Sequence, residues 1–231
     1  MQQYFVNEKL EYNKTISLNE DIVFHLTKVL RNSEKTFRLV DSSQDIYLAE
    51  LINTNAHILS KTNENNELSI DVTALISVIK QDKFEIILQK LTELGVNKIV
   101  PVITAYSQSI NFSDNKLNRF NKIIKEAAEQ SHRNRIPELC PMINFNEILK
   151  YKSDLNLIPY EKETESNLSL KASSITYIIG PEGGFKKDEV DYLCSNGFKS
   201  LSLGKTILRA ETAAITLMSD IKWENKWTHF Q

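Results

Sequence analysis

The first 72 residues carry short apolar runs that are separated by polar turns. Runs of this kind, bounded by turn residues, predict β-strands. One helix is expected among them, from about residue 21 to residue 31, with Phe24, Val29 and Leu30 among its apolar positions. The pattern predicts a small β-rich domain over residues 1–72, with strands at residues 4–6, 37–40, 46–52, 57–59 and 68–72.

Residues 73–231 alternate between strand-like and helix-like segments. This alternation predicts an α/β domain, in which helices cover a mostly parallel sheet. The polar, serine-rich residues 160–174 predict a mobile loop. The expected strands are residues 75–79, 96–103, 175–179 and 201–203, and the expected helices are residues 84–94, 117–131, 187–195 and 210–223.

Composition and charge narrow the class of protein. Hydrophobic residues make up 41% of the chain and charged residues 25%, as in ordinary soluble proteins. No apolar run is long enough to span a bilayer, and the N-terminus lacks a secretion signal, so we expect a cytoplasmic protein. Cys140 and Cys194 stand far apart without a histidine cluster, so neither a disulfide framework nor a metal site is expected. The net charge of −2 means that any nucleic-acid binding must depend on local patches.

The first candidate site is the segment Gly180-Pro-Glu-Gly-Gly184, which follows an apolar strand and precedes a helix. In open α/β sheets, ligands bind beyond the carboxyl ends of the strands. Three glycines allow the backbone to approach a flat ligand closely. A tight strand-to-helix turn accounts for the same residues equally well. A phosphate-binding loop does not, because no Gly-Lys-Ser/Thr follows.

The second candidate site is Leu201-Ser-Leu-Gly-Lys-Thr-Ile-Leu-Arg-Ala-Glu-Thr-Ala213. Here Arg209 stands at the start of an apolar helix, where the helix dipole disfavours a cation. This position indicates another purpose, such as holding a substrate oxygen. A local ion pair between Arg209 and Glu211, or a salt bridge that pins the helix, is the simpler alternative.

Two local clusters of cations stand out in a chain of slightly negative charge. Residues 113–135 hold six Lys/Arg against three Asp/Glu, and five cations, counting His25, lie within residues 25–38. Clustered cations suit the phosphates of a nucleic acid. A solvated helix face accounts for both clusters as well. His132 is either a catalytic base or a surface residue near a helix end.

Six segments together, in order and over nearly the whole chain, resemble the RsmE family of 16S rRNA uridine-N3 methyltransferases, in the SPOUT class. They read YFV near the start, HLTKVLR, QKLTELGVNKIVP (residues 89–101), EAAEQSHRNRIP (126–137), IIGPEGGF (178–185) and SLGKTILRAETA (202–213). The resemblance implies a PUA-like RNA-binding β-barrel over residues 1–72 and a SPOUT methyltransferase domain over residues 73–231. It further implies a C-terminal trefoil knot, S-adenosylmethionine as cofactor, and a homodimer acting on the small ribosomal subunit.

The family's site residues carry over to matching positions of this chain. The resemblance implies that the cofactor lies against residues 102–104, 179–184 and 202–208. Within them, the expected cofactor-binding residues are Thr104, Ile179, Gly180, Pro181, Glu182, Gly183, Gly184, Ser202, Leu203, Gly204, Ile207 and Leu208. The expected RNA-binding residues are His25, Lys28, Arg31, Arg133 and Arg135.

The chemistry of the implied reaction suggests a catalytic cation and a proton acceptor. Uridine N3 must lose its proton, which leaves negative charge on the neighbouring carbonyl oxygens. A guanidinium beside such an oxygen stabilises that charge, so Arg209 is the expected catalytic residue. The proton acceptor is Glu211, His132 or water, and Glu211 is also able to orient Arg209.

The chain departs from the family pattern at two turns. Family members usually carry an Arg-Ser pair where this chain reads Ala105-Tyr-Ser-Gln-Ser109, and Tyr106 is able to stack on a base there. A Gly-Asp turn is replaced by residues 32–35. Rival functions are methylation of a ribose 2′-hydroxyl or of tRNA, and a non-catalytic RNA-binding protein of ribosome assembly.

Overall fold

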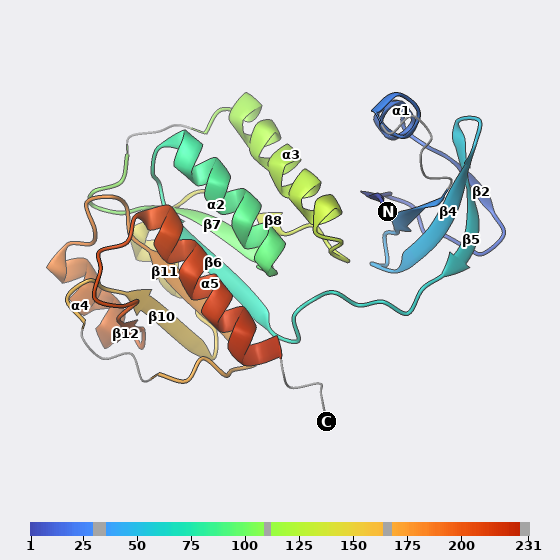
Figure 1. Ribbon diagram of the computed structural model, residues 1–231. Coiled ribbons are helices and arrows are strands. Elements are labelled where there is room, and N and C mark those ends of the chain that lie inside the picture. The colour runs from blue at the N-terminus through green and yellow to red at the C-terminus, as the bar shows by residue number, and fades with distance from the viewer. Residues whose placement is uncertain (30–35, 109–111, 164–167, 227–231) are drawn as a thin grey trace. The chain divides into compact units, whose positions relative to one another are not determined.

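The computed structural model describes residues 1–29, 36–108, 112–163 and 168–226 (Figure 1). Arg31, the turn at residues 32–35 and Ser109 lie outside the described residues. The chain forms two compact units, each with a sheet of its own. The smaller unit consists of Met1–Glu67 and Ala128–Arg135, and the larger consists of Leu68–Ala127 and Ile136–Gln231.

The smaller unit is built on a five-stranded sheet in the order β1-β3-β4-β5-β2. Neighbouring strands are antiparallel except β1 and β3, which are parallel. Alternate side chains along the strands, such as Phe37 and Leu39, are buried in one core. The prediction of a β-rich start is confirmed, and β2 is the strand that the apolar pattern missed. The strands are β1 (Gln3–Phe5), β2 (Thr15–Ser17), β3 (Thr36–Val40), β4 (Ile46–Ile52) and β5 (Asn55–Lys61).

The expected helix of the smaller unit is α1 (Glu20–Phe24), which continues as one π-helical turn, η1 (His25–Val29). It begins at Asn19, whose side-chain oxygen accepts a hydrogen bond of 2.8 Å from the backbone N–H of Ile22. Ile22 and Leu26, four residues apart, are buried in the same core as the strands. The helix therefore has one face against the sheet and leaves Lys28 exposed.

The larger unit is built on a seven-stranded sheet in the order β12-β10-β11-β6-β7-β8, with β9 also paired to β7. All its pairings are parallel, which confirms the α/β prediction. The prediction missed β8, β9 and β10. The strands are β6 (Asp71–Ser77), β7 (Lys98–Ile103), β8 (Glu138–Leu139), β9 (Ile143–Asn144), β10 (Leu155–Pro159), β11 (Ser174–Ile179) and β12 (Lys199–Leu201).

One expectation about this sheet is wrong. The apolar pattern predicts two strands, at residues 68–72 and 75–79, the first of them in the small domain. Residues 71–77 are instead one continuous strand, β6, which pairs with β11 from Asp71 opposite Ser174 to Ile76 opposite Ile179. The buried residues Ala74, Leu75 and Ile76 leave no polar break at which the strand would turn.

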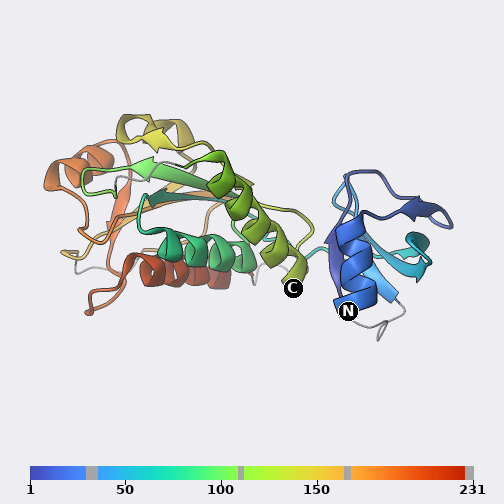
Figure 2. The same ribbon diagram turned by 90° about the horizontal axis from the view of Figure 1, so that it is seen from above.

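Helices cover both faces of the larger sheet (Figure 2). Alternate residues of β6 separate the two cores: Val72, Ala74 and Ile76 pack in the core with α2, α3 and α5, whereas Leu75 packs in the core with α4 and η2. The prediction of four helices is confirmed, and η2 was not expected. These elements are α2 (Gln81–Leu94), α3 (Asp114–Gln130), the 3-10 helix η2 (Phe145–Tyr151), α4 (Lys187–Ser195) and α5 (Ala210–Lys226).

Candidate functional site

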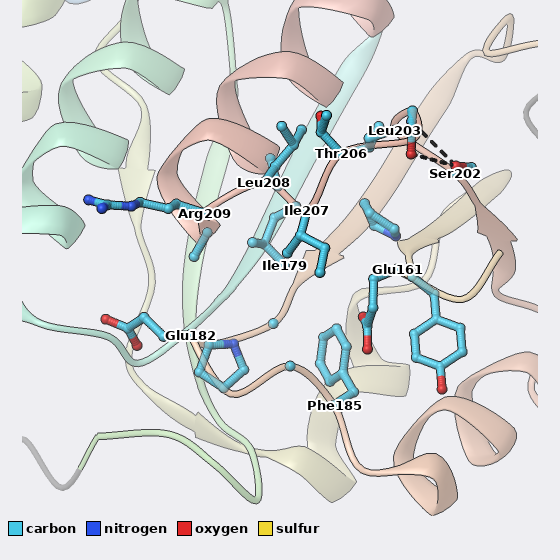
Figure 3. Close-up of a pocket in the computed structure, with 18 of the residues that line it drawn as sticks. Glu161, Ile179, Glu182, Phe185, Ser202, Leu203, Thr206, Ile207, Leu208 and Arg209 are labelled. Atoms are coloured by element: carbon cyan, nitrogen blue, oxygen red, sulfur yellow. Dashed lines mark hydrogen bonds between the residues drawn. The ribbon is translucent and has the colours of Figure 1, made fainter. Parts of the chain in front are cut away.

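A pocket of about 410 Å³ opens at the carboxyl ends of β10, β11 and β12, which are neighbours in the sheet (Figure 3). This is the edge at which parallel α/β sheets bind ligands. The volume is in the range of small-molecule sites. The lining residues come from three stretches of chain, residues 159–161, 179–185 and 202–210, together with Ala213.

The glycine segment at residues 180–184 forms one wall of the pocket. It is a tight turn, because the N–H of Gly184 donates a 2.9 Å hydrogen bond to the carbonyl of Pro181. Gly184 has a φ of +71°, which favours glycine. A Cβ at Gly180 would lie 3.0 Å from the ring of Phe185. Both interpretations of this segment therefore hold together: it is a strand-to-helix turn, and it lines a cavity.

The segment at residues 202–208 forms the opposing wall. The Ser202 hydroxyl donates a 3.2 Å hydrogen bond to the carbonyl of Gly204 and accepts one of 3.3 Å from its N–H (Figure 3). Gly204 has a φ of +116°, and the position of a Cβ there has no atom within 4 Å. Ile207 is 87% exposed although it is a large apolar residue. The wall therefore offers open space beside Gly204 and an exposed apolar side chain at Ile207, which suit a flat ligand.

Arg209 lines the same pocket at the residue before α5. Its side chain is exposed, and no ion pair or hydrogen bond engages it within the described part of the chain. Glu211 is not its partner. The Glu211 carboxylate lies 3.3 Å from Lys83 Nζ on α2, and its side chain is 13% exposed. The local Arg209–Glu211 pair is thus absent among the described residues, whereas a salt bridge that pins the helix is present between Glu211 and Lys83. Glu211 does not line the pocket.

Thr104 is the one expected cofactor residue that does not line the pocket. It is buried after β7, where its hydroxyl lies 3.2 Å from the Ser77 hydroxyl and 2.9 Å from the Ser107 hydroxyl. Its N–H donates a 2.8 Å hydrogen bond to Ser107 as well. These bonds hold the turn after β7 in place. The remaining expected cofactor residues all line the pocket, and they come from the ends of β11 and β12.

The expected RNA-binding residues of the smaller unit are in different environments. His25 is partly buried, and its Nδ1 lies 2.7 Å from the Tyr4 hydroxyl. Lys28 is exposed, and Arg31 lies outside the described residues. Of the two that the structure describes, Lys28 is the one that presents its charge to solvent.

Arg133 and Arg135 both bind the carboxylate of Glu67. The Arg133 guanidinium is nearly inaccessible, with 3% of its side chain exposed, whereas 31% of the Arg135 side chain is exposed. The backbone N–H of Asn134 donates a further 2.9 Å bond to Glu67. Burial would raise the pKa of Glu67, but the bonds from both arginines outweigh it and lower the pKa. Arg133 thus holds this segment in place and leaves Arg135 the more accessible charge.

His132 lies in the same segment. Its Nδ1 lies 3.2 Å from Arg38 and its Nε2 3.1 Å from the carbonyl of Met1, so both ring nitrogens are engaged within the smaller unit. Neither nitrogen is free to take a proton from a substrate in this arrangement.

The sequence patterns missed the third contribution to the pocket, from residues 159–161 at the end of β10. Tyr160 and Glu161 line the cavity, and the Glu161 carboxylate lies next to Gly184, 3.7 Å from the position of a Cβ there. The apolar run Leu-Asn-Leu-Ile-Pro at residues 155–159 was the available signal for this strand. Phe185 also lines the pocket and lies outside the expected segments, whereas Lys205 and Thr206 belong to the expected segment 202–208.

Neither a metal site nor a membrane-spanning helix is found among the described residues. Residues 1–29, 36–108, 112–163 and 168–226 contain no group of His, Cys, Asp and Glu side chains arranged to hold a metal ion. Within the same ranges, no helix combines the length and apolar character that crossing a membrane requires.

Comparison with known families and relatives gave consistent matches. Residues 66–222 match the model of the RNA methyltransferase domain. The chain is 36% identical to the Ribosomal RNA small subunit methyltransferase E of Rickettsia conorii, covering 94% of this chain and 93% of the relative. It is 33% identical to the protein of the same name from Bacillus subtilis, covering 98% of each chain.

Solved structures share the fold. The structure of a Ribosomal RNA small subunit methyltransferase E from Neisseria gonorrhoeae bound to S-adenosyl methionine aligns with a TM-score of 0.87 at 30% identity, covering 96% of this chain and 97% of that one. A putative methyltransferase from Legionella pneumophila, also in complex with that cofactor, aligns with a TM-score of 0.85 at 28% identity, covering 96% of each chain. The chain therefore has the α/β fold of these methyltransferases.

Proposed function

Because this chain belongs to the RNA methyltransferase family and is related over its length to ribosomal RNA small subunit methyltransferases E, we propose that it transfers a methyl group from S-adenosylmethionine to N3 of a uridine in 16S ribosomal RNA. One observation carries the proposal. Two segments that are distant in sequence, residues 179–184 and 202–208, form the walls of a single pocket at the ligand-binding edge of the sheet.

The pocket residues fit S-adenosylmethionine in size and chemistry. The apolar side chains of Ile179, Leu203 and Ile207 suit the flat adenine ring, and the backbone beside Gly204 is open to a ligand. The carboxylates of Glu161 and Glu182 line the same cavity and are suited to ribose hydroxyls or to a positive charge. When bound, the cofactor supplies a methyl group that its sulfonium already activates, so no metal is required.

The residues we assign to the cofactor are those of the two walls. From the end of β11 they are Ile179, Gly180, Pro181, Glu182, Gly183 and Gly184, and from the end of β12 they are Ser202, Leu203, Gly204, Ile207 and Leu208. We assign Thr104 the task of holding the adjacent turn through its hydroxyl bonds.

Arg209 is our proposed catalytic residue. Uridine N3 is a poor nucleophile until it loses its proton, and the resulting charge spreads onto the carbonyl oxygens. An exposed guanidinium in the pocket, free of any carboxylate among the described residues, is available to hold such an oxygen. Electrostatic stabilisation of developing negative charge is commonly the largest contribution to catalysis.

We propose that a water molecule accepts the proton that uridine N3 loses. The Glu211 carboxylate is held by Lys83 and does not line the pocket, so we propose that Glu211 anchors the start of α5 to α2. His132 is bound through both ring nitrogens. Neither side chain is free to accept the proton in this arrangement.

We further propose that the smaller unit is a PUA-like domain that binds the RNA. Its five-stranded sheet, the exposed charge of Lys28 and the partly exposed Arg135 support this role, and His25 and Arg31 belong to the same proposal. The resemblance to the RsmE family also leads us to propose a C-terminal trefoil knot and a homodimer. A ribosomal RNA substrate would place the enzyme in the cytoplasm.

Methylation of purified ribosomal RNA and small subunits with labelled S-adenosylmethionine tests the proposed function. We expect label in 16S RNA, and mass spectrometry of nuclease digests should find 3-methyluridine. Label in a ribose 2′-hydroxyl or in tRNA would overturn the assignment of the base. Absence of cofactor binding in calorimetry would favour a non-catalytic RNA-binding protein.

A further inference from the structure

The turn after β7 is held rigidly against the glycine segment. Glu189 on α4 is only 9% exposed, and its two carboxylate oxygens accept backbone hydrogen bonds, one of 2.8 Å from Ala105 and one of 2.9 Å from Lys186. The N–H of Ser107 donates a 3.1 Å bond to the carbonyl of Thr104. The residues on both sides of Tyr106 are therefore fixed by hydrogen bonds.

The Tyr106 ring is itself presented to solvent. It is 51% exposed, and Lys186 Nζ lies 5.7 Å from the ring centroid. The Cβ of Tyr106 packs on Gly183, where an added Cβ would lie 3.2 Å from it. Gly183 also lines the pocket. One glycine thus separates an exposed aromatic ring from the proposed cofactor site.

We propose that Tyr106 and Lys186 form a platform on which an unpaired base of the RNA substrate stacks. This inference depends on the proposed function, since it assigns RNA as the occupant. Aromatic rings with an adjacent cation are suited to unpaired bases, because every base has a π-face and the phosphates attract the cation. A rigid turn suits this role because a fixed ring loses little conformational freedom on binding.

A purely structural role for Tyr106 does not explain why its ring is exposed beside Lys186. Two backbone hydrogen bonds compensate the burial of the Glu189 carboxylate and hold the turn that carries Tyr106. The Tyr106 hydroxyl has no partner among the described residues, so no hydrogen bond accounts for the position of the ring. The proposed platform gives each feature a role: the ring face stacks on a base, Lys186 attracts a phosphate, and the hydrogen-bonded turn holds the ring in place.

Tyr106→Ala, Tyr106→Phe and Lys186→Ala test the platform in the full-length protein. We expect Tyr106→Ala to raise both the KM and the Kd for RNA about tenfold, as the loss of one stacked base does. Its kcat and its Kd for S-adenosylmethionine should stay near those of the wild type. Tyr106→Phe keeps the ring face and should restore the affinity for RNA. Lys186→Ala should weaken RNA binding less and make it less dependent on salt.

Tyr192→Ala is the matched control. Tyr192 is a 38% exposed tyrosine on α4 that packs on Phe145 and does not line the pocket. Its truncation should leave the KM for RNA unchanged. Thermal unfolding of each variant verifies that it is folded.

Unchanged RNA affinity in Tyr106→Ala would overturn the inference. Equal losses in Tyr106→Ala and Tyr106→Phe would also overturn it, because they would indicate a bond to the hydroxyl rather than stacking. Fluorescence anisotropy with a single-stranded RNA separates this inference from the proposed function. If the wild type binds RNA without methylating it, the proposed function fails, and the platform is still judged by the affinities of the variants.

Discussion

Arg209 gives the most direct test at the scale of single residues. We expect Arg209→Ala to lower kcat about 100-fold or more, because a cation at the developing charge is removed. The Kd for S-adenosylmethionine should change little, since the guanidinium is assigned to the reacting base. Arg209→Lys keeps the charge without the planar fork and should recover part of the activity. Single-turnover methylation and calorimetry measure the two quantities, and wild-type turnover in Arg209→Ala would exclude this residue from the mechanism.

Gly204 tests the wall of the pocket at the same scale. Its φ of +116° strains any other residue, and its Cβ position is empty space. We expect Gly204→Ala to cost about 1–2 kcal/mol of stability and also to weaken S-adenosylmethionine binding, because the new methyl group would intrude on the ligand.

Gly197→Ala is the matched control for that change. Gly197 has a φ of +90° after α4, and it does not line the pocket. It should lose similar stability with no effect on the Kd for the cofactor. Thermal unfolding and calorimetry of both variants measure the difference, and equal cofactor affinities would show that the backbone at Gly204 does not face the ligand.

At the scale of elements, Glu67 joins the two stretches of chain that form the smaller unit. It is the last residue of the first stretch, and it binds the segment at residues 132–135 in the second. Its side chain is 9% exposed, and it binds two arginines. Glu67→Gln would leave Arg133 buried without its counter-charge, so we expect a loss of about 3 kcal/mol in the free energy that protects this segment. Asp45→Asn, which removes the exposed ion pair with Lys61, should cost less than about 1 kcal/mol. Hydrogen exchange of residues 132–135 measures both.

The same carboxylate predicts a pH dependence. The pKa of Glu67 is lowered in the folded protein below its ordinary value of 4.5, so the folded state favours the charged form. Its contribution to stability is therefore complete above that ordinary value and is lost as the pH falls through the lowered folded pKa. The difference in protection between wild type and Glu67→Gln should shrink as the pH falls below about 4.5. A constant difference from about pH 7 to about pH 3 would contradict this linkage.

At the scale of the whole molecule, the net charge of −2 does not favour a polyanion, so RNA affinity must come from few cations. We expect Lys28→Ala to reduce the salt dependence of RNA binding, lowering the slope of log K against log salt by about one. Lys14→Ala is the control, because Lys14 is also exposed but is paired 2.6 Å from Glu11. Filter binding at several salt concentrations measures the slopes. Equal slopes for wild type and Lys28→Ala would remove Lys28 from the RNA surface.

Much of the fold follows from local pattern. The helix at residues 187–195 and the strand at residues 46–52 were predicted with the bounds that the structure has. Both follow from apolar periodicity, which is a property of neighbouring residues. The two glycine-containing segments were also identified from sequence, because a turn after a buried strand has a recognisable composition. The assignment of a methyltransferase needed the family resemblance, since local composition left each segment with two interpretations.

Tertiary structure decided what those segments have in common. Strand order is non-local, so no local pattern indicates that β10 lies between β11 and β12 and brings Tyr160 and Glu161 to the pocket. The partners of charged side chains are equally non-local. The Glu211 carboxylate pairs with Lys83 and not with Arg209, and the buried Arg133 pairs with Glu67. The sequence by itself thus determined most of the helices and strands and the residues worth testing. Packing decided which of those residues face one cavity, because the neighbours of a side chain depend on long-range contacts.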